Sequence, residues 1–205
     1  MKLWLICSAE KPMPDTPLTA EEYRAARREA MKAAAVPEGE KPLHGGGRRI
    51  RISGAPCARI SAEALCPGAE YAVRAELDEA EPHPGFLSDT ALPPALRAFL
   101  DAPRGEAKRA ARKRAEALIA ELEKDGRDCV LFSHPGQIPL LMDALRRRGC
   151  CFNRFYTGAV RPLERILATS RTAHCGGCGH NCMLSNPGCG VGRDKARRAG
   201  IPFKT

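Results

Sequence analysis

Short apolar runs recur along the chain, and each is ended by polar residues, glycine or proline. Runs of this length, rich in bulky and β-branched side chains, predict buried or half-buried strands rather than helices. We therefore expect a sheet of several strands, formed by residues 2–6, 49–53, 71–77, 128–133, 152–156 and 164–169.

Helical patterns separate these runs. Thr19, followed three residues later by Glu22, forms a capping-box motif and predicts a helix that ends near Ala35, before Pro37. Residues 79–94 are rich in proline and are predicted to form a long connection. Three further helices are predicted at residues 61–65, 105–124 and 137–148.

The alternation of strands and helices predicts an α/β fold: a three-layer sandwich in which helices flank a mostly parallel sheet. We assign residues 1–170 to this domain and residues 171–205 to a small cysteine-rich extension with a basic tail. The 205 residues, 43% hydrophobic and 28% charged, suit one globular domain with such an appendage.

No apolar run approaches the roughly 20 residues that a helix needs to span a bilayer. The apolar run at residues 3–6 is too short for a signal peptide, and Glu10 and Lys11 follow it closely. We therefore expect a cytoplasmic protein without a membrane partner. The sequence points to no particular oligomeric state.

Ten cysteines in a reducing compartment point to metal or redox chemistry rather than to disulfides. Four of them, Cys175, Cys178, Cys182 and Cys189, have the spacing C-x2-C-x3-C-x6-C. Four thiolates at such spacing can hold one tetrahedral zinc ion, and an iron–sulfur cluster is the alternative. The segment has few apolar residues, so we expect the metal to order it.

The charge of +9 is concentrated in the last part of the chain, because residues 145–205 carry +10 and the remainder carries −1. A short basic helix is expected after Cys189, with cations at Arg193, Lys195, Arg197 and Arg198. This distribution is compatible with an anionic partner, including the backbone of a nucleic acid, and equally with a solvated basic face. No aromatic residues are interleaved for stacking on single-stranded bases.

Residues 1–168 resemble the histidine phosphatase superfamily, the phosphoglycerate-mutase-like group, in the order of their elements and in three motifs. Ser133-His134-Pro135-Gly136, after an apolar strand, is similar to the segment with the family's second histidine. Leu77-Asp78-Glu79 is similar to the segment that supplies an acidic proton donor. Ser53 and the helix that follows it are similar to a third family segment. The resemblance implies a phosphate pocket that keeps His134 and Glu79 in register.

The same resemblance places three other residues at family catalytic positions. Ser8 stands where the family has its nucleophilic histidine, and Cys7 and Cys57 stand where it has two phosphate-binding arginines. Each lost arginine removes charge-assisted hydrogen bonds worth roughly 1.5–3 kcal/mol apiece. A serine without a base is a poor nucleophile at neutral pH. We therefore expect a catalytically degenerate protein, a pseudoenzyme that acts by binding or regulation.

Three alternatives remain open from the sequence. The chain could be an active phosphatase that uses His134 with another nucleophile on a phosphate ester, or a nucleic-acid-associated module that works through its basic C-terminal third. In the third, Cys7 and Cys57 form a thiol pair, with or without His134, that binds metal or senses oxidation. The remaining cysteines are interpreted as buried small hydrophobic residues: Cys66, Cys129, Cys150 and Cys151.

Overall fold

The computed structural model of the chain describes residues 1–43, 47–80, 87–153, 160–169 and 187–198. Within these residues one sheet has the strand order β3-β2-β4-β1-β6-β5. Neighbours from β3 to β1 are parallel, whereas β6 is antiparallel to both β1 and β5. The strands are β1 (Lys2–Cys7), β2 (Arg49–Ile52), β3 (Tyr71–Val73), β4 (Cys129–Ser133), β5 (Cys151–Phe152) and β6 (Arg165–Thr169).

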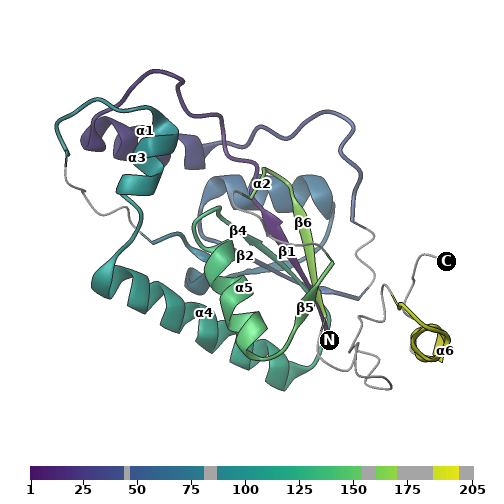
Figure 1. Cartoon of the computed structure of the whole chain (residues 1–205). Coiled ribbons are helices and arrows are strands. Elements are labelled where there is room, and N and C mark those ends of the chain that lie inside the picture. The colour runs from purple at the N-terminus through teal and green to yellow at the C-terminus, as the bar shows by residue number, and fades with distance from the viewer. Residues whose placement is uncertain (44–46, 81–86, 154–159, 170–186, 199–205) are drawn as a thin grey trace.

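Helices cover both faces of the sheet (Figure 1). One hydrophobic cluster joins the sheet to α4 and α5, and a second joins it to α2, so that two helical layers enclose the strands. The predicted α/β fold with a mostly parallel sheet is confirmed. The helices are α1 (Ala20–Lys32), α2 (Pro56–Leu65), α3 (Pro94–Leu100), α4 (Gly105–Asp125), α5 (Ile138–Arg147) and α6 (Gly190–Arg198), with a 3-10 turn η1 (Ala75–Leu77).

Local sequence signals explain where helix α1 begins and where helix α4 ends. The side chain of Thr19 accepts from the backbone of Glu22, whose carboxylate accepts from the backbone of Thr19, so the predicted capping box is present. Gly126 ends α4 in a left-handed conformation with φ of 70°, which glycine adopts without a steric penalty. Both ends agree with the sequence prediction.

Three expectations need correction. Helix α2 begins at Pro56 rather than at residue 61, because proline is favoured in the first turn of a helix. The strand predicted over 71–77 ends at Val73 and is followed by η1. Helix α3 was not predicted, because its seven residues follow a proline-rich segment. Of the strand predicted at 152–156, residues 154–156 lie outside the described part of the chain.

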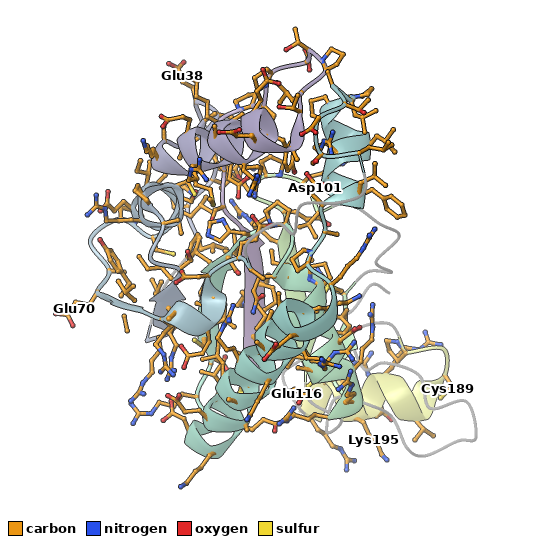
Figure 2. The ribbon with its side chains drawn as sticks, turned by 90° about the vertical axis from the view of Figure 1, so that its left-hand side faces the viewer. Glu38, Glu70, Asp101, Glu116, Cys189 and Lys195 are labelled. Carbon is orange, nitrogen blue, oxygen red and sulfur yellow. The ribbon has the colours of Figure 1, made fainter. Side chains whose placement is uncertain are left out.

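Helix α3 is joined to the loop before α1 by a fully buried arginine. Arg97 is 0% exposed, and its guanidinium donates to the backbone carbonyls of Leu18, Leu87 and Thr90. It also pairs with Asp101, 3.5 Å away and 1% exposed, which Figure 2 labels at the end of α3. This one side chain therefore fastens three separate backbone segments together.

Strand β1 lies inside the sheet between β4 and β6. Leu3 is aligned with Cys129 on β4 in parallel register and with Ala168 on β6 in antiparallel register. Its alternate residues Leu3, Leu5 and Cys7 belong to the cluster under α4 and α5, whereas Ile6 belongs to the cluster under α2. Both faces of β1 are therefore buried, as its apolar sequence indicates.

Among the described helices, none combines the length and the apolar character that a membrane crossing requires. The predicted basic helix near the C-terminus is present as α6. Of the predicted cysteine-rich extension, residues 171–186 and 199–205 lie outside the described part of the chain. The division of the chain at residue 170 therefore stays a prediction.

Candidate functional site

The candidate site lies where three parallel strands end. Ser8 follows β1, Ser53 follows β2 and His134 follows β4. The backbone N–H of Ser8 donates to the carbonyl of Ser133 at 2.8 Å, and that of Ser53 donates to the carbonyl of Phe132 at 3.1 Å. Hydrogen bonds of this kind keep the three chain segments side by side beyond the strands. Ligands of parallel α/β sheets bind at this carboxyl edge.

His134 is the centre of the site. It is 1% exposed, and both ring nitrogens have partners: Nε2 lies 2.7 Å from Oγ of Ser53, and Nδ1 lies 2.8 Å from Oε1 of Glu10. Burial disfavours the charged ring, but hydrogen bonds with Cys57 and Glu10 and the charges of Glu79 and Glu10 outweigh burial and raise its pKa to about 9. The imidazole is therefore protonated at neutral pH.

Arg27 of α1 connects the two acidic residues of the site. Its guanidinium forms ion pairs with Glu10 and with Glu79, and all three side chains are at most 18% exposed. Burial works against the charge of Glu10, but the hydrogen bond from His134 and the charge of Arg27 lower its pKa below 4.5. Two carboxylates thus face two cations, Arg27 and protonated His134. The charges of Glu10, Glu79, Arg27 and His134 therefore add up to zero, and no positive charge is left over for an anionic ligand.

The turn after His134 is shaped to receive Glu79. The backbone N–H of Gly136 donates to Oε1 of Glu79 at 2.9 Å. A Cβ atom at position 136 would lie 2.4 Å from the same oxygen, closer than real contacts allow. Glycine is therefore required at this position if Glu79 is to keep its place beside Arg27.

The predicted site residues fall into two groups. Ser8 and Cys57 are buried at the carboxyl edge, with Cys57 at the start of α2 in contact with His134. Cys7 instead packs in the cluster beneath α4 and α5. Burial raises its thiol pKa, and the charge of Glu10 adds to this effect, so Cys7 stays a neutral thiol. Because α2 covers the other face of the sheet, this separation argues against a Cys7–Cys57 thiol pair.

Sequence reasoning missed Glu10 and Arg27 as members of the site. Glu10 lies three residues after Cys7, the last residue of β1, and two after Ser8, so its position beside the site could have been expected. Arg27 comes four residues after Tyr23 and three before Ala30, which are two of the three buried residues of α1. That spacing was the available signal that Arg27, among several cations of the helix, points inward.

The predicted metal ligands of the C-terminal segment are described only in part. Cys175, Cys178 and Cys182 lie outside the described residues, whereas Cys189 lies at the start of α6 (Figure 2). The Sγ atom of Cys189 accepts a hydrogen bond from the backbone N–H of Gly192 at 3.4 Å. Binding of a nucleic acid by this region stays a prediction. Three cysteines interpreted as small hydrophobic residues are buried, as predicted: Cys66, Cys129 and Cys150.

No protein-family model matches the chain, and no curated protein matches its sequence. Among solved structures, TTHB049 from Thermus thermophilus is 26% identical over 82% of this chain and 92% of its own, with a TM-score of 0.42. A phosphoglycerate mutase from the same organism is 25% identical over the same shares, with a TM-score of 0.42. A mycobacterial glucosyl-3-phosphoglycerate phosphatase is 19% identical over 81% of this chain and 88% of its own, with a TM-score of 0.44. Similarity at these TM-scores identifies neither the fold nor the activity of this chain.

Proposed function

We propose that this chain is a catalytically degenerate protein of histidine-phosphatase type, which no longer transfers phosphoryl groups and acts by binding or regulation. The observation that carries the proposal is the engagement of Arg27 by Glu10 and Glu79. The family resemblance of the sequence supplies the comparison: where that family has arginines for phosphate, this chain has Cys7 and Cys57.

A phosphate ester has little to bind at this site. Phosphoryl transfer depends on positioning and on neutralisation of the phosphate oxygens by cations. Arg27 and His134 already neutralise two buried carboxylates, so a phosphate would have to displace Glu10 or Glu79 from its partner. Leaving a buried charge without its partner costs about 3–5 kcal/mol, whereas one charge-assisted hydrogen bond to phosphate returns only about 1.5–3 kcal/mol.

The site also lacks an activated nucleophile among the described residues. A phosphoryl acceptor needs a free imidazole nitrogen, whereas both nitrogens of His134 are engaged and the ring is protonated at neutral pH. The Oγ atom of Ser8 is buried without a hydrogen-bond partner in the described part of the chain, so no base there activates it. Both candidate groups are therefore in the wrong state for attack on phosphorus.

The first prediction concerns activity on a generic ester, p-nitrophenyl phosphate. We expect wild-type protein and the His134→Gln variant to release nitrophenol at the same rate as buffer alone, from acidic to alkaline pH. A second readout is a titration with inorganic phosphate followed by NMR, in which no saturating shift is expected. Turnover by the wild type that His134→Gln abolishes would instead establish the active phosphatase.

We also propose that Cys175, Cys178, Cys182 and Cys189 bind zinc, with an iron–sulfur cluster as the alternative. The spacing of the four cysteines supports the proposal. The hydrogen bond from the N–H of Gly192 to Sγ of Cys189 also supports it, because backbone donors at a helix start stabilise a thiolate. We call these four residues the C-terminal cysteine set.

The second prediction tests the C-terminal cysteine set by metal analysis of anaerobically purified protein. We expect the Cys178→Ser, Cys182→Ser double variant to contain about one zinc equivalent less than the wild type, because a tetrahedral site does not survive the loss of two ligands. Cys129→Ser, which changes a buried cysteine of β4, is the matched control and should keep the wild-type content. A brown protein with iron and sulfide would favour the cluster, and equal zinc in all three proteins would refute the assignment.

A further inference from the structure

Three potential metal ligands of different chemistry meet beside the end of β1. Glu10, Cys57 and His134 each offer one ligand atom, and these three atoms all lie within 4.8 Å of one another. Cys57 is fully buried, His134 is 1% exposed and the Glu10 side chain is 9% exposed. They come from three separate segments, the loop after β1, the first turn of α2 and the loop after β4, so the fold itself brings them together.

We propose that Glu10, Cys57 and His134 bind one zinc ion, at a site distinct from the C-terminal cysteine set. Thiolate, imidazole and carboxylate are the three protein ligand types of zinc, and three such ligands leave a fourth position open. The inference rests on the proposed function, because it assumes that this pocket does not transfer phosphoryl groups. In the proposal, a metal ion binds where the related enzymes would bind phosphate.

Neighbouring groups already hold the ligands in orientation. Glu10 directs Oε1 to His134 and Oε2 to Arg27, so it can bind a metal through one oxygen while it keeps its ion pair through the other. On the other side of the ring, Nε2 of His134 faces Oγ of Ser53. A partner on the second nitrogen fixes the ring and raises the basicity of a ligating histidine.

A further polar group lies two residues before Glu10 on the same segment. Ser8 is 1% exposed, and its Oγ atom has no hydrogen-bond partner within the described residues. Buried hydroxyl groups are nearly always paired, and an exception indicates a missing water or ion. The segment that supplies Glu10 therefore carries a buried hydroxyl whose hydrogen bonding a bound water molecule or ion would complete.

The surroundings of the three ligand atoms are acidic, which suits a divalent cation. Glu10 and Glu79 place two carboxylates at the pocket, and one guanidinium, that of Arg27, pairs with both. Zinc binds histidine as the neutral imidazole and cysteine as the thiolate, so its affinity for such a site depends on pH.

The test uses the full chain carrying Cys178→Ser and Cys182→Ser, which removes the C-terminal cysteine set. After treatment with a chelator, this protein is titrated with Zn²⁺ and with Co²⁺. We expect one equivalent of either ion to bind, and the cobalt form to show a sulfur-to-cobalt charge-transfer band. Adding Cys57→Ser should abolish that band and lower zinc affinity at least about 100-fold, in excess of the effect of an outer-sphere change.

Controls separate the ligand role from a folding defect. Cys66→Ser, which alters a buried cysteine at the other end of α2, should leave binding and the band unchanged. Glu10→Gln should weaken zinc binding while the far-ultraviolet circular dichroism of the variant stays that of its parent. Failure to bind zinc in the parent, or a band that survives Cys57→Ser, overturns the inference. Neither result bears on the proposed loss of phosphatase activity, which is tested independently with p-nitrophenyl phosphate.

Discussion

Replacing Arg97 with leucine should lower the free energy of unfolding by about 3–5 kcal/mol, one of the two largest losses we expect from a single substitution in this chain. The leucine fills part of the volume but donates no hydrogen bond to the carbonyls of Leu18, Leu87 and Thr90. It also leaves Asp101, 1% exposed, buried without the guanidinium. The carbonyls of Leu18 and Leu87 keep a backbone donor each, from Leu92 and Thr90, whereas the Thr90 carbonyl loses the guanidinium. The expected loss therefore comes mainly from removing the buried cation beside Asp101, together with its hydrogen bonds to the backbone.

Chemical denaturation followed by circular dichroism measures this loss. Arg112→Leu is a matched control, since Arg112 is 42% exposed in its side chain and pairs with exposed Asp143 at 3.7 Å. An exposed pair of this kind contributes at most about 1 kcal/mol, so the control should stay close to wild type. A loss below about 1 kcal/mol for Arg97→Leu would mean that Arg97 does not fasten α3 as the structure indicates.

The second large effect concerns Arg27, measured on chelator-treated protein. Arg27→Met should reduce stability by about 3–5 kcal/mol near neutral pH, because Glu10 and Glu79 then share a buried site without their common cation. Adding Glu79→Gln should restore most of the loss, since one carboxylate remains and His134 neutralises it. A double variant as unstable as Arg27→Met alone would show that charge is not the cause.

The loss caused by Arg27→Met should shrink as the pH falls. In the wild type the pKa of Glu10 lies below 4.5, so its interactions stabilise the protein above that pH and are lost as pH falls through the folded-state pKa. In the variant the unpaired carboxylates take up protons more readily, and this relieves their repulsion. Denaturation curves at several acidic pH values test the trend, and a loss that grows on acidification contradicts it.

Much of the fold was predictable because its signals are local. The apolar run of β4 and the capping box of Thr19 each appear within a few residues, and each predicted element forms. Helix α3 was missed because its stability comes from Arg97, whose acceptors lie up to 79 residues away in sequence. No pattern within the helix itself indicates contacts of that kind.

The candidate site was only half predictable for the same reason. His134 and Glu79 could be found from short motifs that resemble a known family. The role of Arg27 depends on the position of α1 over the ends of the strands, since the ion pair with Glu79 joins residues 52 apart. Likewise, Cys57 could be placed at a family position, but its contact with His134 required the packing of α2. The ion pairs and contacts of the site therefore depend on tertiary packing that no short sequence motif indicates.

The central position of β1 has a consequence for synthesis on the ribosome. The start of β1 meets the start of β4 through a contact between Lys2 and Asp128, which are 126 residues apart. At translation rates of about 5–20 residues per second, β1 waits roughly 6–25 s for the strand that pairs with it. During that time its apolar segment is a binding site for chaperones and a template for aggregation. Neighbouring helices can form earlier, so completion of the sheet, rather than formation of helices, should limit how soon the nascent chain becomes resistant to proteolysis.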